Sequence, residues 1–173
     1  KAPAEYRDPI EGLALLREVV ERALAAPVRR PRVAFVVQRY GAEVSGGSEA
    51  HCRAVVRRLA AKADVEVLTT TARDYETWAP HYAAGAGALD GVPVHRFPVL
   101  GGREVRAFSR ASEAFFARAE RSAAEEAAWI HDQGPFAPGL VDAVLERADD
   151  FDAFVFFTYL YHPTVMGLLE VGR

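Results

Sequence analysis

The chain has 173 residues, half of them apolar and 26% charged, with a formal net charge of −3 at pH 7. This length suits one domain or one lobe of a larger enzyme, and the composition is that of a globular chain rather than a disordered or fibrous one. The net charge gives no electrostatic reason to expect nucleic-acid binding. No apolar run reaches the ~18 residues of a membrane span. The single cysteine excludes an internal disulfide and a thiolate metal cluster.

Residues 1–30 are predicted to form a helical extension of the main domain. Asp8 suits a helix cap and Pro9 the first helical position, and apolar residues recur at helical spacing from Ile10 to Leu24 before prolines interrupt the pattern. The chain begins without Met, has no basic-then-apolar leader and ends just after an apolar segment. We therefore expect it to be part of a longer protein.

From residue 31 onward, the pattern predicts alternating strands and helices. Residues 32–38 form a continuous apolar and β-branched run, which is typical of a strand buried on both faces. A turn rich in Gly and Ser over residues 40–48 leads into an amphipathic helix with Cys52 on its inner side. Residues 64–70 then alternate as a second strand, so the region is predicted to be a strand–helix–strand unit.

The second half of the chain predicts further strands and helices. Residues 71–91 form a long polar and aromatic connection, a length that is usually functional or mobile inside a compact domain. Residues 92–97 are predicted to be a short third strand, in which Pro93 indicates a late start or a place near the sheet edge. The remaining predicted elements are one long helix from Val105 to Trp129, a helix that begins at Pro138, a central strand over residues 151–158 and a last helix over residues 163–169.

This order predicts a fold of the α/β class over residues 31–173, a Rossmann-like open and mainly parallel sheet with helices on both faces. In such sheets, ligands bind beyond the carboxyl ends of the strands. Candidate site residues therefore come from three loops, over residues 38–49, 70–78 and 158–164.

The first of these loops contains Gly46-Gly47-Ser48, which ends a turn and opens a helix. Glycines there let a ligand approach the backbone, and the free amides of a helix N-terminus favour a phosphate. The loop from Gly41 to Ser48 has the spacing of a P-loop, but Gly47 stands where the phosphate-binding lysine must be. It does not read G-x-G-x-x-G either, which disfavours a nicotinamide site. A purely structural glycine pair remains the alternative.

Six short stretches carry a wider pattern, which resembles the N-terminal domain of the family 4 (group 1) glycosyltransferases. These are retaining enzymes of the two-lobed GT-B fold, and the resemblance covers residues 32–169. The stretches are Arg39-Tyr40-Gly41, Gly46 to His51, Asp74-Tyr75 with Trp78, Gly91 to Val94, Gln133-Gly134-Pro135 and Tyr159 to Thr164.

The resemblance implies roles for individual residues. The backbone of Gly46 and Gly47 would meet the diphosphate of a nucleotide-sugar donor, and His162 would lie beside the transferred sugar as the catalytic residue. An imidazole there can donate a hydrogen bond or stabilise developing charge; the alternative is a residue at the start of a helix that is bonded only to backbone. The side chains implied to face the acceptor are Arg39, Glu49, Tyr75, Trp78 and Gln133.

Alternatives stand beside several of these roles. Tyr75 and Trp78 are also explained by ordinary core packing, and Glu49 by the preference of acidic residues for the first turn of a helix. No metal site is expected, because the histidines lack ligand spacing. Asp150-Phe151-Asp152 spells the D-x-D of metal-dependent transferases, but it precedes its strand and is predicted to be a turn at the wrong end of the sheet.

The implied reaction moves a sugar from a nucleotide-diphosphate donor to a hydroxyl of a glycan, a lipid-linked glycan or a small molecule, without a cofactor. The C-terminal donor-binding lobe of the family is absent from this chain, so the lobe is expected to be inactive alone. A cytoplasmic location is expected, and no basic amphipathic helix indicates contact with a membrane surface. The alternatives are a non-catalytic sugar- or nucleotide-binding module and a protein–protein interaction domain.

Overall fold

The structure is a computed structural model that describes residues 17–18, 20–22 and 29–171. The predicted extension over residues 1–30 lies mostly outside the described residues; of its described part, residues 17–18 and 20–22 are helical and residues 29–30 are not. In the described part of the chain, no helix combines the length and the apolar character needed to cross a membrane. The helices are α2 (Gly47–Leu59), α3 (Val105–Phe116), α4 (Ala123–Gln133), α5 (Pro138–Glu146) and α6 (His162–Val171), and a short 3₁₀ helix covers Ala148–Asp150.

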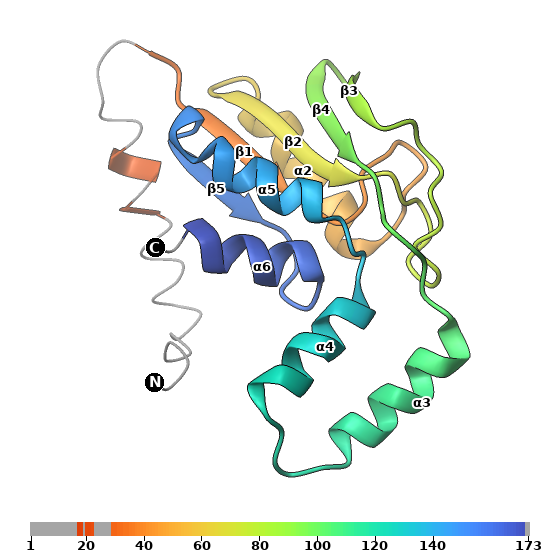
Figure 1. Ribbon diagram of the computed structural model, residues 1–173. Coiled ribbons are helices and arrows are strands. Elements are labelled where there is room, and N and C mark those ends of the chain that lie inside the picture. Colours follow the sequence, from red (N-terminus) through yellow and green to blue (C-terminus); the bar gives the residue numbers. More distant parts are fainter. Residues whose placement is uncertain (1–16, 19, 23–28, 172–173) are drawn as a thin grey trace.

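Five strands form one sheet in the order β3–β4–β2–β1–β5 (Figure 1). Strand β1 (Arg32–Val36) pairs in parallel with both β2 (Asp64–Thr70) and β5 (Ala153–Phe156). Strand β2 also pairs in parallel with β4 (Val92–Phe97), and β3 (Gly85–Leu89) lies antiparallel on the outer edge of β4. The predicted open, mainly parallel α/β sheet is confirmed.

Neighbouring residues of the central strands face two different layers of helices. Phe35 of β1 packs in one core cluster with Cys52 and Val56 of α2. Val36, the next residue, packs in a second cluster with Leu140 of α5. A strand buried on both faces has no polar side, which explains why β1 is a continuous apolar run. The predicted helices on both faces are therefore present (Figure 1).

The prediction of a single helix from Val105 to Trp129 is wrong, because this segment folds into α3 and α4. Helix α4 begins with a capping box, in which the Ser122 hydroxyl accepts the N–H of Glu125 and the Glu125 carboxylate accepts the N–H of Ser122. Helix α4 then folds back on α3, and the ring of Trp129 stacks on that of Phe115 at 5.5 Å between centroids. This α3–α4 hairpin projects from the body of the domain (Figure 1).

Strand β3 was not predicted, because Gly-Ala-Gly-Ala-Leu is poor in the residues that favour strands. It is joined to β4 by Asp90-Gly91, whose φ angles of 53° and 78° are those of a tight hairpin turn. Because β3 covers the edge of β4, Pro93 has a strand on one side, while the pairing of β4 with β2 begins only at Val94. The strand begins at Val92, before Pro93, and lies next to the edge strand β3, so the predicted place near the sheet edge is confirmed and the late start is not.

Candidate functional site

The loops that follow β1, β2 and β5 meet around Gln38, at the carboxyl end of the sheet. The Thr70 hydroxyl donates to the Gln38 carbonyl at 2.6 Å, and the Thr158 hydroxyl donates to the Gln38 Oε1 at 2.9 Å. Thr158 has a φ of 68°, which is strained for a β-branched residue. The parallel sheet thus brings the three predicted loops together at the edge where ligands bind in such folds.

Glu49 lies in the first turn of α2, buried with only 4% of its surface exposed. Its Oε1 accepts the Nε of Arg39 at 2.9 Å, the Nη2 of Arg39, and the Nε2 of Gln38 at 2.8 Å, while its Oε2 accepts the Ser48 hydroxyl at 2.8 Å. Arg39 also donates from Nη1 to the Arg73 carbonyl at 2.9 Å, in the loop after β2. These surroundings are those of a buried structural ion pair, which must keep all its partners to offset desolvation.

The two glycines at the start of α2 have different surroundings. A Cβ on Gly46 would lie 2.1 Å from the Oε2 of Glu49 and 2.8 Å from the Nη2 of Arg39, so the ion pair occupies that space. A Cβ on Gly47 would meet nothing within 4 Å. Gly46 is the N-cap residue and forms no side-chain cap, so it leaves first-turn N–H groups of α2 without a capping side chain. The approach to Gly47 is open, whereas that to Gly46 is filled by protein.

Trp78 is a core residue that also borders the site. Only 2% of its surface is exposed, it packs with Ala72 and Val99, and its Nε1 donates to the Gln133 carbonyl at 2.7 Å. The predicted alternative of core packing describes its position. Tyr75, in contrast, is 53% exposed, with the Arg39 guanidinium 5.4 Å from its ring centre.

Arg103 is a site residue that was not predicted. It donates from Nε to the Glu76 carbonyl at 2.7 Å, from Nη1 to the backbone and side-chain oxygens of Gln133 at 3.1 and 2.9 Å, and from Nη2 to the Tyr75 carbonyl. Partial burial lowers the pKa of its guanidinium. Arg103 therefore ties the loop after β2 to the end of α4.

A signal for Arg103 was present in the sequence. Gly101-Gly102-Arg103 follows β4 just as the glycine pair of the first loop follows β1, although the three predicted site loops do not include it. Gly101 has a φ of 77°, which favours glycine. The carboxyl end of each parallel strand is a place to look for site residues.

Tyr161 lies beside Trp78 and close to the ion pair of Arg39 and Glu49. Its ring packs edge-on against Trp78 at 5.2 Å between centroids. Burial raises the pKa of Tyr161, the negative charge of Glu49 raises it further, and the positive charges of Arg39 and Arg103 oppose that rise. Four of the five predicted acceptor-side residues therefore lie near this ring: Arg39, Glu49, Tyr75 and Trp78.

His162 is the first residue of α6 and is 7% exposed. Its backbone N–H donates to the Gly134 carbonyl at 3.0 Å, which fits the alternative of a helix-start residue. Its side chain, however, has a buried Nδ1 with no hydrogen-bond partner among the described residues. Burial, reinforced by the nearby His131, lowers the pKa of His162 to about 4, so the imidazole is neutral at pH 7. A buried nitrogen without a partner is a costly arrangement that needs a reason.

The described residues bring no three His, Cys, Asp or Glu side chains together in an arrangement that could hold a metal ion. Asp152, of the D-x-D sequence, precedes β5 and accepts the backbone N–H of Arg32 at 2.8 Å as well as the guanidinium of Arg29. It therefore lies at the amino end of the sheet, as predicted, and joins the starts of two neighbouring strands.

Comparison with protein-family models, with curated proteins and with solved structures gave no match to this chain.

Proposed function

We propose that residues 31–173 form the acceptor-side lobe of a retaining glycosyltransferase, which moves a sugar from a nucleotide-diphosphate donor to a hydroxyl acceptor. The observation that carries the proposal is the open approach to Gly47, at a helix start without a side-chain cap. This helix start follows β1 directly, at the carboxyl end of a parallel sheet. Exposed amides and the positive end of the helix dipole favour an anion such as a diphosphate at such a place.

The neighbouring charges are compatible with an anion there. The carboxylate of Glu49 is the negative charge closest to the helix start, and it is fully engaged by Arg39 and Gln38. The ion pair holds the loop after β1 against the helix and leaves the space beside the Cα of Gly47 open. In this proposal, Gly47 contacts the diphosphate, whereas Gly46 is required for the packing that shapes the loop.

His162 is proposed to act on the transferred sugar as a neutral imidazole. With its pKa lowered to about 4, it is unsuited to donating a full proton at pH 7 and suited to hydrogen bonding. The unpartnered Nδ1 supports this role, because no described residue already engages this nitrogen.

The other candidate side chains are proposed to support this site. Glu49, Trp78 and Gln133 are engaged by protein partners and would hold the loops in place. Tyr75 is exposed beside Arg39 and is proposed to contact the acceptor. A second lobe would complete the donor site, and the cytoplasm is the proposed location of the reaction.

Binding of nucleotide-diphosphate sugars tests the proposal. UDP-glucose and GDP-mannose are titrated into the protein and into Gly47→Val, in which a branched side chain occupies the space proposed for the diphosphate. Ala50→Val is the matched control, because it adds bulk to the same helix where the backbone N–H is already bonded to the Gly46 carbonyl.

The expected result is binding by the protein and by Ala50→Val, and at least about tenfold weaker binding by Gly47→Val with unchanged stability. Affinity that is equal in all three proteins, or undetectable for every donor, contradicts the proposal. Binding that is sensitive to Gly47→Val, without any sugar transfer by a longer protein that contains this lobe together with a second lobe, would instead indicate a non-catalytic binding module.

A further inference from the structure

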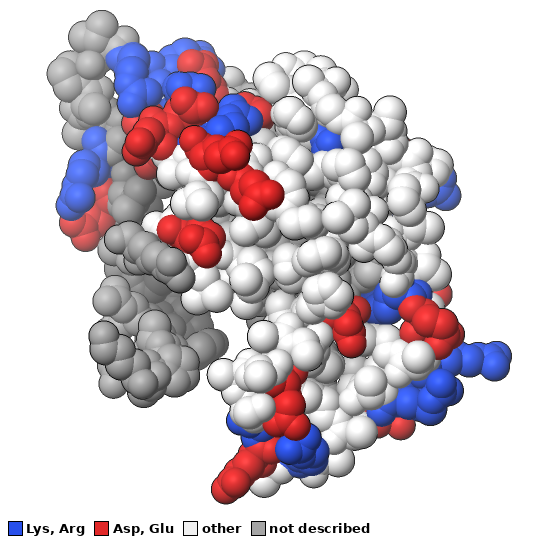
Figure 2. Space-filling model, viewed as in Figure 1, with Lys and Arg blue, Asp and Glu red and all other residues white. Residues whose placement is uncertain are grey.

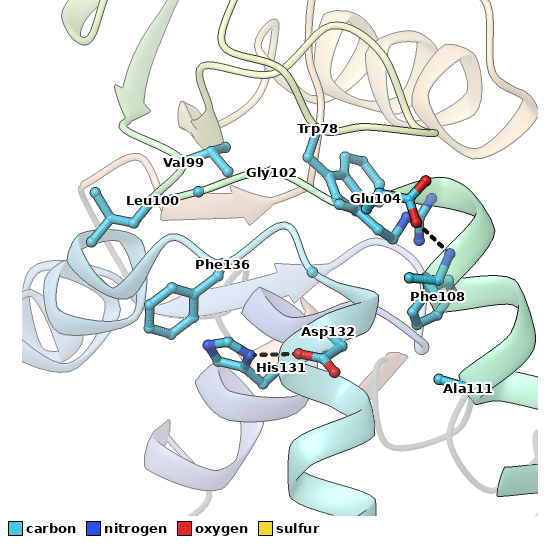
Figure 3. A pocket seen from close by; sticks show the side chains of 14 residues that line it. Trp78, Val99, Leu100, Gly102, Glu104, Phe108, Ala111, His131, Asp132 and Phe136 are labelled. Carbon is cyan, nitrogen blue, oxygen red and sulfur yellow. Dashed lines mark hydrogen bonds and ion pairs between the residues drawn. The ribbon is translucent and has the colours of Figure 1, made fainter.

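A cavity of about 250 Å³ lies between the loop after β4, the α3–α4 hairpin and the segment that leads into α5. Figure 3 shows Trp78, Glu104 and Phe108 along one side of this cavity and Phe136, His131 and Asp132 along the other. Three of these six side chains are aromatic and two are carboxylates.

The aromatic rings of Trp78, Phe108 and Phe136 form apolar walls of the cavity. The Arg103 guanidinium, which also lines the cavity, lies 5.1 Å and 4.7 Å from the ring centres of Trp78 and Phe108. Across the cavity, the ring of Phe136 packs against His131 at 4.4 Å between centroids. Aromatic faces carry partial negative charge, so they attract polarised C–H groups such as those on the flat faces of a sugar ring.

The charged groups do not favour an anion in the cavity. Arg103 is the one arginine among the lining residues, and four of its five N–H groups are engaged by protein oxygens. The Glu104 carboxylate accepts the N–H groups of Arg106 and Ala107, and that of Asp132 contacts His131 at 3.0 Å. Both carboxylates keep further lone pairs, so they can accept hydrogen bonds from ligand hydroxyls.

The surface around the cavity has no dominant charge. Figure 2 shows basic and acidic side chains mixed over the α3–α4 hairpin, which Figure 1 places at the lower end of this view. A mixed surface provides no field that would attract a strongly charged ligand. Aromatic walls, carboxylate acceptors and a neutral surface together favour an uncharged polyol over a phosphate or a carboxylate.

The cavity adjoins His162, the proposed catalytic residue. The His162 ring packs against Phe136 at 5.0 Å and lies 6.3 Å from His131, and its backbone N–H bonds to Gly134. Phe136, His131 and Gly134 all line the cavity. A hydroxyl of a molecule bound there would therefore lie near the imidazole that is proposed to act on the transferred sugar.

We propose that this cavity binds a single uncharged sugar ring, which is the acceptor of the transfer. The role of this sugar as the acceptor rests on the proposed function, whereas its binding to the cavity can be tested separately. The volume lies below the roughly 300–1,000 Å³ of pockets for drug-sized ligands, which suits one ring better than an extended chain. Asp132 and Glu104 would accept hydrogen bonds from its hydroxyls, and Phe136 would pack against its C–H face.

The two tryptophans of the chain allow a direct test by NMR. Trp78 lines the cavity, whereas Trp129 packs within the hairpin and donates to Ser112 at 2.9 Å. Methyl glucoside and methyl mannoside are titrated into the protein, and the two indole N–H signals are followed, with Trp129→Phe used to assign them. The expected result is a saturable shift of the Trp78 signal and an unmoved Trp129 signal, with a dissociation constant in the millimolar range.

Two variants separate the contacts from general effects on folding. Asp132→Ala removes a carboxylate of the cavity and is expected to weaken binding about tenfold. Glu113→Ala removes an exposed carboxylate of α3 that does not line the cavity, and is expected to leave binding unchanged. Equal effects of the two variants contradict the assignment.

Charged probes complete the test. If inorganic phosphate or glucuronic acid shifts the Trp78 signal at lower concentration than the methyl glycosides do, the cavity is an anion site and the inference is wrong. No shift with any glycoside, in a protein that still binds nucleotide-diphosphate sugars through Gly47, refutes the cavity assignment and leaves the proposed function intact. A glycoside shift without nucleotide-sugar binding supports the cavity as a sugar site and refutes the proposed donor site.

Discussion

The two glycines at the start of α2 should respond in opposite ways to the same substitution. In Gly46→Ala, the new Cβ would lie 2.1 Å from the Oε2 of Glu49, so the carboxylate must move. That movement breaks its hydrogen bond with Ser48 and disturbs the contacts of Oε1 with Arg39 and Gln38. Overpacking costs about 1–3 kcal/mol and a buried polar group without its partner a similar amount, so we expect a loss of about 2–4 kcal/mol of stability.

Gly47→Ala has no such cost. Its Cβ would meet nothing within 4 Å, and alanine restricts the unfolded chain more than glycine does. We therefore expect Gly47→Ala to leave the free energy of unfolding unchanged or to raise it by up to about 1 kcal/mol. The two variants should thus differ by about 3 kcal/mol, a large fraction of the stability of a domain of this size.

Urea unfolding at pH 7 measures this difference, with equal m values as the check that both variants unfold in the same way. A third variant tests the cause. In a Glu49→Ala background the obstructing carboxylate is gone and only the flexible end of the Arg39 side chain has to shift, so adding Gly46→Ala should cost less than about 1 kcal/mol. If Gly46→Ala and Gly47→Ala unfold within about 0.5 kcal/mol of each other, or if the cost of Gly46→Ala persists without Glu49, the packing argument is refuted.

Two further predictions concern α6 and α5. Burial lowers the pKa of His162 to about 4, so between that value and the ~6.5 of an exposed histidine the unfolded chain binds a proton that the folded chain does not. Lowering the pH from 7 to 5 should therefore remove about 2 kcal/mol of stability, as measured by urea unfolding. The variant His162→Gln should lose this pH dependence. A Cβ on Gly167 would lie 2.6 Å from the Phe156 ring, so Gly167→Ala should cost about 1–3 kcal/mol of stability in thermal unfolding. Gly139→Ala is the control and should cost little, because its Cβ would lie 3.7 Å from Phe97. Equal melting temperatures of the two variants contradict the prediction.

Much of the fold could be predicted because the central strands carry strong local signals. From Val33 to Val36, β1 is apolar at every position, since it packs against α2 on one face and α5 on the other. The hairpin of β3 and β4 carried one signal that was overlooked, the turn pair Asp90-Gly91. The break between α3 and α4 was likewise indicated by the Ser-x-x-Glu sequence that begins at Ser122.

The site could be predicted less well, because its interactions connect separate loops. Nothing local distinguishes a solvated glutamate in a first helical turn from Glu49, whose burial depends on Arg39 ten positions earlier. Arg103 joins the loop after β2 to the end of α4 because the chain returns Gln133 to it after the hairpin. Loop positions follow from the parallel sheet, whereas the pairing of side chains within them depends on the tertiary structure.

The exposure of the α3–α4 hairpin has a consequence for the dynamics of the cavity that it helps to form. Both helices are fully described, and none of their residues is buried. Their aromatic residues pack mainly against one another, and Phe116 is still 58% exposed. Segments of this kind exchange their amide hydrogens through local opening at free energies well below that of global unfolding. Phe108 and Asp132 belong to this segment, while Trp78 and Val99 belong to the body of the domain. Local opening of the hairpin therefore changes the shape of the cavity on the time scale of that opening, because it moves Phe108 and Asp132 relative to Trp78 and Val99.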